Sequence, residues 1–178
     1  MSIISRKEVL PLNELPAPDF SHLEDRVDLA ALRCRVSGSW TLGETHGIRH
    51  WDRVYANGRR LIVDGVNPLV VACFSYVHDA CRKDDWEDFY HGPRAAEWIA
   101  TLRKTYLKGL TDEEFRLLQD ACRLHTTAWR TGNPTIDACF DADRLDLWRV
   151  GITPDPSKMA TSLGAELASQ ARSGGRTS

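Results

Sequence analysis

The chain has 178 residues, 42% of them hydrophobic and 27% charged, which is the composition of one ordinary globular domain. A chain of this length can bury a core without metal or disulfide staples, so any bound metal is expected to serve chemistry. Its 23 Lys and Arg against 25 Asp and Glu give a formal net charge of -2. This balance excludes a broad basic surface of the kind that binds a nucleic-acid polymer or an anionic membrane.

The cysteine content and the apolar runs predict a cytoplasmic protein without a membrane segment. The five cysteines are an odd number and contain no CxxC pair, as expected for reduced thiols. The longest strictly apolar run, Leu69 to Phe74, is far shorter than a membrane span. The start of the chain also lacks the uninterrupted apolar segment that is typical of a secretory signal.

Helical periodicity recurs from residue 21 onward without sustained period-two alternation, which predicts an all-α fold. The first helix is expected over about 21–37, where Ser21 and Glu24 have the form of a capping box. Its apolar face would contain Leu23, Val27, Ala31 and Cys34. A second helix is expected from about His46 to Asp64, ended by Gly65, with His50, Val54 and Leu61 along one side.

Three later helices have clear start signals. Asn67 and Pro68 form a cap for a helix that is apolar nearly all round, which predicts burial in the middle of the domain and places His78 and Asp79 at its far end. A helix over 91–107 has Pro93 in its first turn. Thr111 and Glu114 form a capping box for a helix through His125, and Asn133 with Pro134 caps the last helix, over about 134–150.

These elements predict a single helical bundle of about five core helices plus one N-terminal helix. Residues 1–45 form an N-terminal extension that contains this helix, residues 46–150 form the main domain, and residues 151–178 form a C-terminal extension. The first 20 residues and the last dozen are expected to be loose ends.

Polar groups that can ligate a metal fall on helix faces that should be buried. Asp143 lies on the apolar stripe of the last helix, and His125 lies on that of the preceding helix. A buried, unpaired carboxylate costs several kcal/mol, and a buried imidazole needs partners for both nitrogens. A metal ion satisfies both demands. A set of imidazoles and carboxylates suits iron, manganese, cobalt, nickel or zinc.

Five segments resemble the HD-domain superfamily of metal-dependent phosphohydrolases, in the order and with the gaps of that superfamily. They are HGIRHWDRV (46–54), YVHDACR (76–82), HGPRAAEW (91–98), RLHTT (123–127) and DADRLDL (141–147). The resemblance covers about residues 46–150. It is closest to the two-metal bacterial branch that hydrolyses diadenosine tetraphosphate.

The resemblance implies two divalent transition-metal ions and a phosphorylated, nucleotide-like substrate. One ion would be held by His50, His78, Asp79 and Asp143, and the second by His91 and His125, with Asp79 bridging. The implied reaction cleaves a phosphoester or phosphoanhydride bond by a metal-bound hydroxide. Two other functions stay open, namely a two-iron HD-type oxygenase and a nucleotide-binding sensor without turnover.

Several side chains near these ligands are candidates for binding the substrate. Arg82, three residues after Asp79, is expected to act in catalysis by holding phosphate oxygens, and Arg144 and Arg149 are further candidates. His46 would either line the mouth of the site or cap a helix. Asp141 and Asp146 would be solvated or would support a ligating imidazole.

Aromatic residues and one charged segment have two open interpretations. Four tryptophans are expected in the core, with base stacking as the alternative: Trp51, Trp98, Trp129 and Trp148. The segment KDDWEDFY, residues 83–90, is expected to be either a solvated loop or a lid over the pocket.

Overall fold

The computed structural model describes residues 25–174, and within this range the chain is helical and contains no strand. The described residues form seven α-helices, namely α2 (Leu29–Ser37), α3 (Ile48–Arg60), α4 (Pro68–Val77), α5 (His91–Trp98), α6 (Asp112–Leu124), α7 (Pro134–Arg144) and α8 (Ser162–Gly174). Short 3-10 helices span Ile99–Leu102, Leu147–Val150 and Pro156–Lys158. The predicted all-α fold is confirmed. No helix among these residues is long and apolar enough to cross a membrane.

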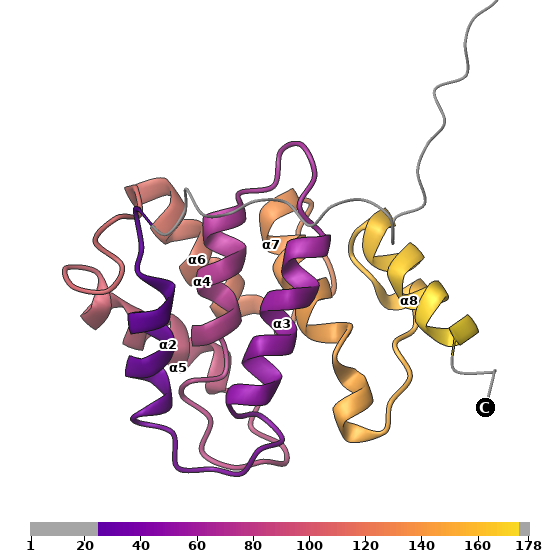
Figure 1. The fold of residues 1–178 in the computed structure, drawn as a ribbon, viewed down its shortest axis with the longest axis horizontal. Coiled ribbons are helices and arrows are strands. Elements are labelled where there is room, and N and C mark those ends of the chain that lie inside the picture. The colour runs from indigo at the N-terminus through magenta and orange to yellow at the C-terminus, as the bar shows by residue number, and fades with distance from the viewer. Residues whose placement is uncertain (1–24, 175–178) are drawn as a thin grey trace, which may run out of the picture.

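Helix α4 is the centre of the bundle. Every residue from Leu69 to Val77 is buried, and α4 packs against α2, α3, α6 and α7 (Figure 1). The α3–α4 contact is close because Gly58 has no side chain: an added Cβ would lie 2.6 Å from Cγ1 of Val71. The central burial predicted from the apolar sequence of this helix is confirmed.

The helix caps form as the sequence predicts. The side chain of Asn67 accepts hydrogen bonds from the N–H groups of Leu69 and Val70 at 3.0 and 3.1 Å, and Asn133 does the same at the start of α7. Thr111 and Glu114 form a reciprocal capping box on α6. These side chains satisfy N–H groups that the first helical turn leaves without a backbone partner.

The first described helix starts later than predicted and faces differently. Asp28 caps α2 by accepting the N–H of Ala31 at 2.8 Å, so the helix starts at Leu29. The predicted capping box of Ser21 and Glu24 lies outside the described residues. Because Leu29, Leu32 and Val36 form the buried face of α2, Cys34 is exposed, and its predicted place on the apolar face was wrong.

Four other helices are shorter than predicted. Helix α3 begins at Ile48, so His46 precedes it. Helix α4 ends at Val77, with His78 as its C-cap and Asp79 directly after it. Helices α5 and α7 give way to the 3-10 helices that start at Ile99 and Leu147. The predicted helices over 91–107 and 134–150 therefore included these 3-10 turns, which continue the helical pattern of the sequence beyond the end of the α-helix.

The C-terminal extension is folded through Gly174, so the predicted loose end was wrong for residues 167–174. Helix α8 buries Leu167 and Ala168 and lies beside α7, at the right of Figure 1. The buried carboxylate of Asp141 in α7 accepts hydrogen bonds from the N–H groups of Ala160 and Thr161 at 2.7 and 2.8 Å. These bonds fix the segment that leads into α8.

Candidate metal centre

The bundle brings all six predicted metal ligands to one place. His50 lies on the buried face of α3, and each of the other five lies within or next to the first or last turn of a helix. They form two groups, His50 with His78 and Asp143, and Asp79 with His91 and His125. Within each group the candidate ligand atoms lie within 4.8 Å of one another, so each group can hold a metal ion.

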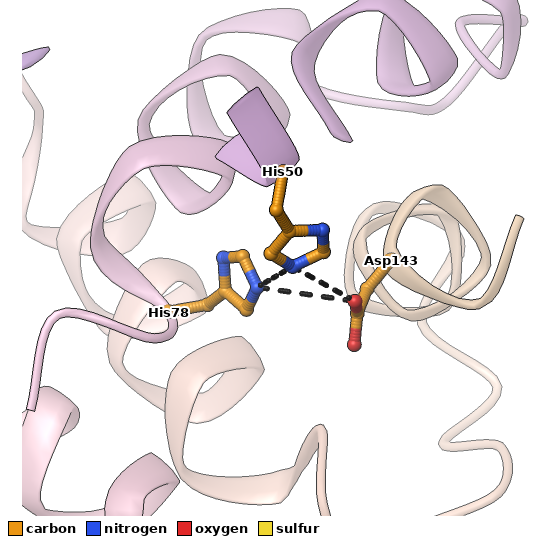
Figure 2. Close-up of side chains that lie close together, drawn as sticks. All are labelled: His50, His78 and Asp143. Carbon is orange, nitrogen blue, oxygen red and sulfur yellow. Dashed lines mark hydrogen bonds and ion pairs between the residues drawn. The ribbon is translucent and has the colours of Figure 1, made fainter. Parts of the chain in front are cut away.

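The first group is drawn in Figure 2, where side chains from α3, the end of α4 and the end of α7 point toward one another. Nε2 of His50 lies 3.1 Å from Nε2 of His78 and 3.3 Å from Oδ1 of Asp143. Both imidazoles are fully buried. The group therefore presents two nitrogens and one oxygen to a common point.

The second group lies beside the first and is joined to it by Asp79. Oδ1 of Asp79 is 2.9 Å from Nε2 of His91, which is 2.8 Å from Nε2 of His125. Oδ2 of the same carboxylate lies 3.5 Å from Nε2 of His50 and 3.6 Å from Nε2 of His78. Each oxygen of Asp79 thus faces one group, which is the arrangement of a bridging carboxylate.

An oxygen atom lies behind each of the four imidazoles, at its Nδ1 atom. Nδ1 of His50 lies 2.8 Å from Oδ2 of Asp146, and Nδ1 of His78 lies 3.1 Å from the Phe74 carbonyl. The carbonyls of Asp88 and Cys122 lie in the same way behind His91 and His125. Because these oxygens only accept, each Nδ1 donates to its oxygen, and in the neutral form of an imidazole the lone pair of Nε2 then points to the centre.

This arrangement fits a bound cation. When the imidazoles are neutral, the two Nε2 to Nε2 contacts bring lone pairs together at hydrogen-bond distance, and a cation that accepts both pairs removes this repulsion. In addition, Oδ1 of Asp143 is buried and accepts no hydrogen bond from the described residues. An unpartnered buried carboxylate oxygen is costly, and a metal ion would satisfy it.

The electrostatics of the cluster also favour a positive ion. Burial lowers the pKa of His78 to about 3, so this imidazole is neutral at pH 7. Burial opposes charge on His50 as well, but the carboxylates of Asp143 and Asp146 outweigh it and raise the pKa of His50. Despite their burial, the surrounding imidazoles keep the pKa of Asp79 and Asp143 below the usual range. The carboxylates are therefore ionised and attract a cation.

Asp146 supports a ligand. Besides the Nδ1–H of His50, its carboxylate accepts a hydrogen bond from Nε of Arg53 at 2.6 Å, and its side chain is only 8% exposed. This is the supporting role that the sequence left open for Asp146. Asp141 takes neither predicted role, since it is buried and holds the segment before α8.

Two of the predicted substrate-binding arginines lie at the centre. A pocket of about 280 Å³ opens above it and is lined by Asp79, Arg82, Trp86, Glu87, Asp88, Phe89, His91, His125, Thr126, Asp143 and Arg149. Nε and Nη2 of Arg82 donate to the carbonyls of Asp84 and Trp86, so Arg82 fixes the loop at the rim of this pocket. Nη1 of Arg149 lies 3.7 Å from Oδ1 of Asp143.

The other two predicted substrate-binding residues lie elsewhere. Arg144 donates to the carbonyls of Ala128 and Trp129 at 2.9 and 2.8 Å and does not line the pocket, so the structure does not support its predicted role. His46 is no helix cap, because Gly47 holds that position on α3. Its Nδ1 lies 3.2 Å from Oδ1 of Asp85, and His46 lines an adjoining pocket.

The tryptophans differ from the core expectation in two cases. Trp51 is fully buried and Trp98 partly buried, but Trp129 and Trp148 are 61% and 44% exposed, so the core prediction was wrong for these two. Trp86, which the sequence interpretation did not single out, is 87% exposed at the pocket rim. The sequence signal that could have identified Trp86 is its position as an aromatic residue in a charged segment between two predicted ligands, Asp79 and His91.

No protein-family model, curated protein or solved structure matches this chain. The residues that the structure describes show by themselves a buried cluster of histidines and aspartates that can hold a metal ion. Its donor atoms are nitrogen and oxygen, which are the atoms that first-row divalent metals accept.

Proposed function

We propose that the chain is an HD-type metal-dependent phosphohydrolase that cleaves a phosphoester or phosphoanhydride bond of a nucleotide-like small molecule. The observation that carries the proposal is the carboxylate of Asp79, which presents one oxygen to each of two ligand groups at the floor of an open pocket. A shared carboxylate between two nitrogen-rich groups is the arrangement that binuclear hydrolases use. The resemblance of five sequence segments to the HD-domain superfamily points the same way.

The six residues of the cluster would hold two divalent ions of iron, manganese, cobalt, nickel or zinc. His50, His78 and Asp143 would hold one ion, His91 and His125 the other, and Asp79 would bridge them. Bound metals of this kind activate water and stabilise charge on phosphoryl oxygens.

The chain's own side chains supply orientation around this centre. Arg149 is 10% exposed and fixed at the pocket wall by bonds to the carbonyls of Thr45 and Asp146, so its guanidinium is placed to hold a phosphate oxygen. Arg82 differs in what it binds, because its Nε and Nη2 donate to carbonyls of the loop at the pocket rim, while its Nη1 lies 3.8 Å from Oδ1 of Asp79. We assign Arg149 to the phosphate and Arg82 mainly to the loop.

The test combines metal analysis with phosphate release. Full-length protein purified without chelators is expected to contain close to two transition-metal ions per chain and to release phosphate from some member of a panel of nucleotides and dinucleoside polyphosphates. Elemental mass spectrometry and a phosphate assay measure the two quantities. Iron with dioxygen uptake and no phosphate release would instead indicate the oxygenase, and nucleotide binding without turnover would indicate the sensor.

The variant Asp79→Ala is expected to lose phosphate release to background, because it removes the carboxylate shared by both ligand groups. It should keep a helical circular-dichroism spectrum, since the apolar core does not depend on the cluster. The matched control is Asp52→Ala, which removes a carboxylate that pairs with Arg33 outside the cluster. Full turnover by Asp79→Ala would show that the active site lies elsewhere.

A further inference from the structure

A second, larger pocket adjoins the pocket of about 280 Å³ at the candidate metal centre, which is called the metal pocket below. It has a volume of about 760 Å³ and is called the side pocket below. Trp86, Glu87 and Arg149 line both pockets, so the two are neighbours that meet at these residues. The volume lies within the range of roughly 300–1,000 Å³ that is typical of small-molecule sites. A ligand with its phosphate at the metal pocket can therefore extend into the side pocket.

Trp86 offers the side pocket a free aromatic face on a fixed backbone. Its indole is 87% exposed, and no described residue makes a ring contact or hydrogen bond with it. Its backbone is held on both sides, since its N–H donates to Oδ1 of Asp84 and its carbonyl accepts from Arg82, each at 2.8 Å. An indole in this state is a ready platform for stacking by a planar ring.

The charged side chains around the side pocket indicate which charge and which hydrogen-bonding groups a bound ring would carry. Glu87 is exposed and has no ion-pair partner among the described residues, while Asp85 accepts a hydrogen bond from the N–H of Gly43 at 3.2 Å. The cation Arg149 stands at the boundary, where its Nε donates to the Thr45 carbonyl at 3.0 Å. Carboxylates repel an anionic group and accept hydrogen bonds from N–H donors.

We propose that the side pocket binds the non-phosphate end of the substrate, an uncharged or cationic heteroaromatic ring that carries N–H donors. The ring stacks on Trp86 and directs an N–H group at Glu87, and Arg149 contacts the phosphate between the ring and the metal centre. This inference rests on the proposed phosphohydrolase function for the position of the phosphate. The stacking of the ring rests on the side pocket alone.

Adenosine is the probe, because it has the ring and an amino group but no phosphate and cannot be hydrolysed. Titration of the full-length protein with adenosine, followed by calorimetry and tryptophan fluorescence, is expected to show saturable binding. Trp86→Ala should weaken this binding about tenfold or more, as expected for loss of a stacked base. The matched control is Trp129→Ala, which removes a tryptophan that is 61% exposed but lines neither pocket.

A second comparison tests the hydrogen bond to Glu87. Adenosine should bind more tightly than purine riboside, which lacks the amino group, and Glu87→Gln should reduce this preference because a neutral amide is a weaker acceptor. No saturable binding of adenosine, or equal binding by wild type and Trp86→Ala, would overturn the proposal. Phosphate release without Trp86-dependent adenosine binding would reject the side pocket alone. Trp86-dependent adenosine binding without phosphate release would reject the hydrolase and retain the ring site.

Discussion

Among the four imidazoles of the cluster, His50 alone has a carboxylate behind it. His78, His91 and His125 donate to backbone carbonyls, whereas His50 donates to Asp146, which Arg53 also binds. A negative charge behind an imidazole strengthens it as a donor to a metal and fixes its orientation. His50 should therefore be the strongest nitrogen ligand, and its group should be the tighter of the two.

Asp146→Asn is expected to weaken binding of one metal ion by about tenfold or more, because the variant keeps an acceptor but removes the charge. The second ion, held through carbonyl-supported imidazoles, should be affected less. Competition of the full-length protein with a metal-sensitive dye measures both affinities without an activity assay. Asp52→Asn is the control on α3, since its carboxylate pairs with Arg33 and does not contact His50. Unchanged metal affinity in Asp146→Asn would refute the supporting role.

The candidate ligands could be predicted from sequence and the exposed indole of Trp86 could not, for a physical reason. Asp143 and His125 stand out because helical periodicity places them on a buried apolar stripe. Burial of a polar side chain there costs free energy unless a hydrogen-bond partner or a metal ion binds it. Trp86 lies in an irregular loop, and no periodicity tells whether such a residue is buried or exposed. Arg144 lies away from the pocket because it binds carbonyls of a loop whose position the sequence does not indicate.

At the scale of elements, Glu114 joins three segments of the bundle. Its carboxylate accepts hydrogen bonds from Nη1 of Arg26 at 2.9 Å before α2, from Nδ2 of Asn67 at 3.0 Å before α4, and from the N–H of Thr111 at 2.7 Å before α6. Burial opposes its ionisation, but Arg26, Thr111 and Asn67 outweigh burial and lower the pKa of Glu114 to about 2. The capping box was visible in the sequence, whereas the contacts with Arg26 and Asn67 are long-range and were not.

Glu114→Gln is expected to lower the free energy of unfolding by about 2 kcal/mol at pH 7, the scale of charged hydrogen bonds in a partly exposed network. Since the pKa is depressed in the folded state, this stabilisation is complete above the ordinary value of 4.5 and is lost as the pH falls toward about 2. Urea unfolding between pH 7 and pH 3 should therefore show the two proteins converge at acid pH. Glu113→Gln, exposed in the same turn, should unfold like wild type at every pH, and a constant gap for Glu114→Gln would contradict the mechanism.

At the scale of the whole molecule, the C-terminal segment belongs to the same folded unit as the metal centre. Asp141 holds residues 160 and 161, and Asp143, two residues later on α7, is a proposed ligand. The small and polar residues of α8 give little apolar periodicity, so the sequence did not predict that helix. Its position is set by Asp141 and by the burial of Leu167 and Ala168, which are contacts distant in sequence.

Gly164→Ala tests this attachment. A Cβ at position 164 would lie 2.8 Å from Cγ of Asp141 and nearer still to its carboxylate oxygen, so Asp141 must move and weaken its bonds to residues 160 and 161. We expect a loss of about 2 kcal/mol in unfolding free energy, the usual scale of overpacking, even though Gly to Ala in a helix is otherwise stabilising. Chemical denaturation measures the loss, with Glu166→Ala on the exposed face of α8 as the control. If α8 were merely an appendage, Gly164→Ala would instead unfold like wild type or be more stable, because the helix would shift away without cost to the bundle.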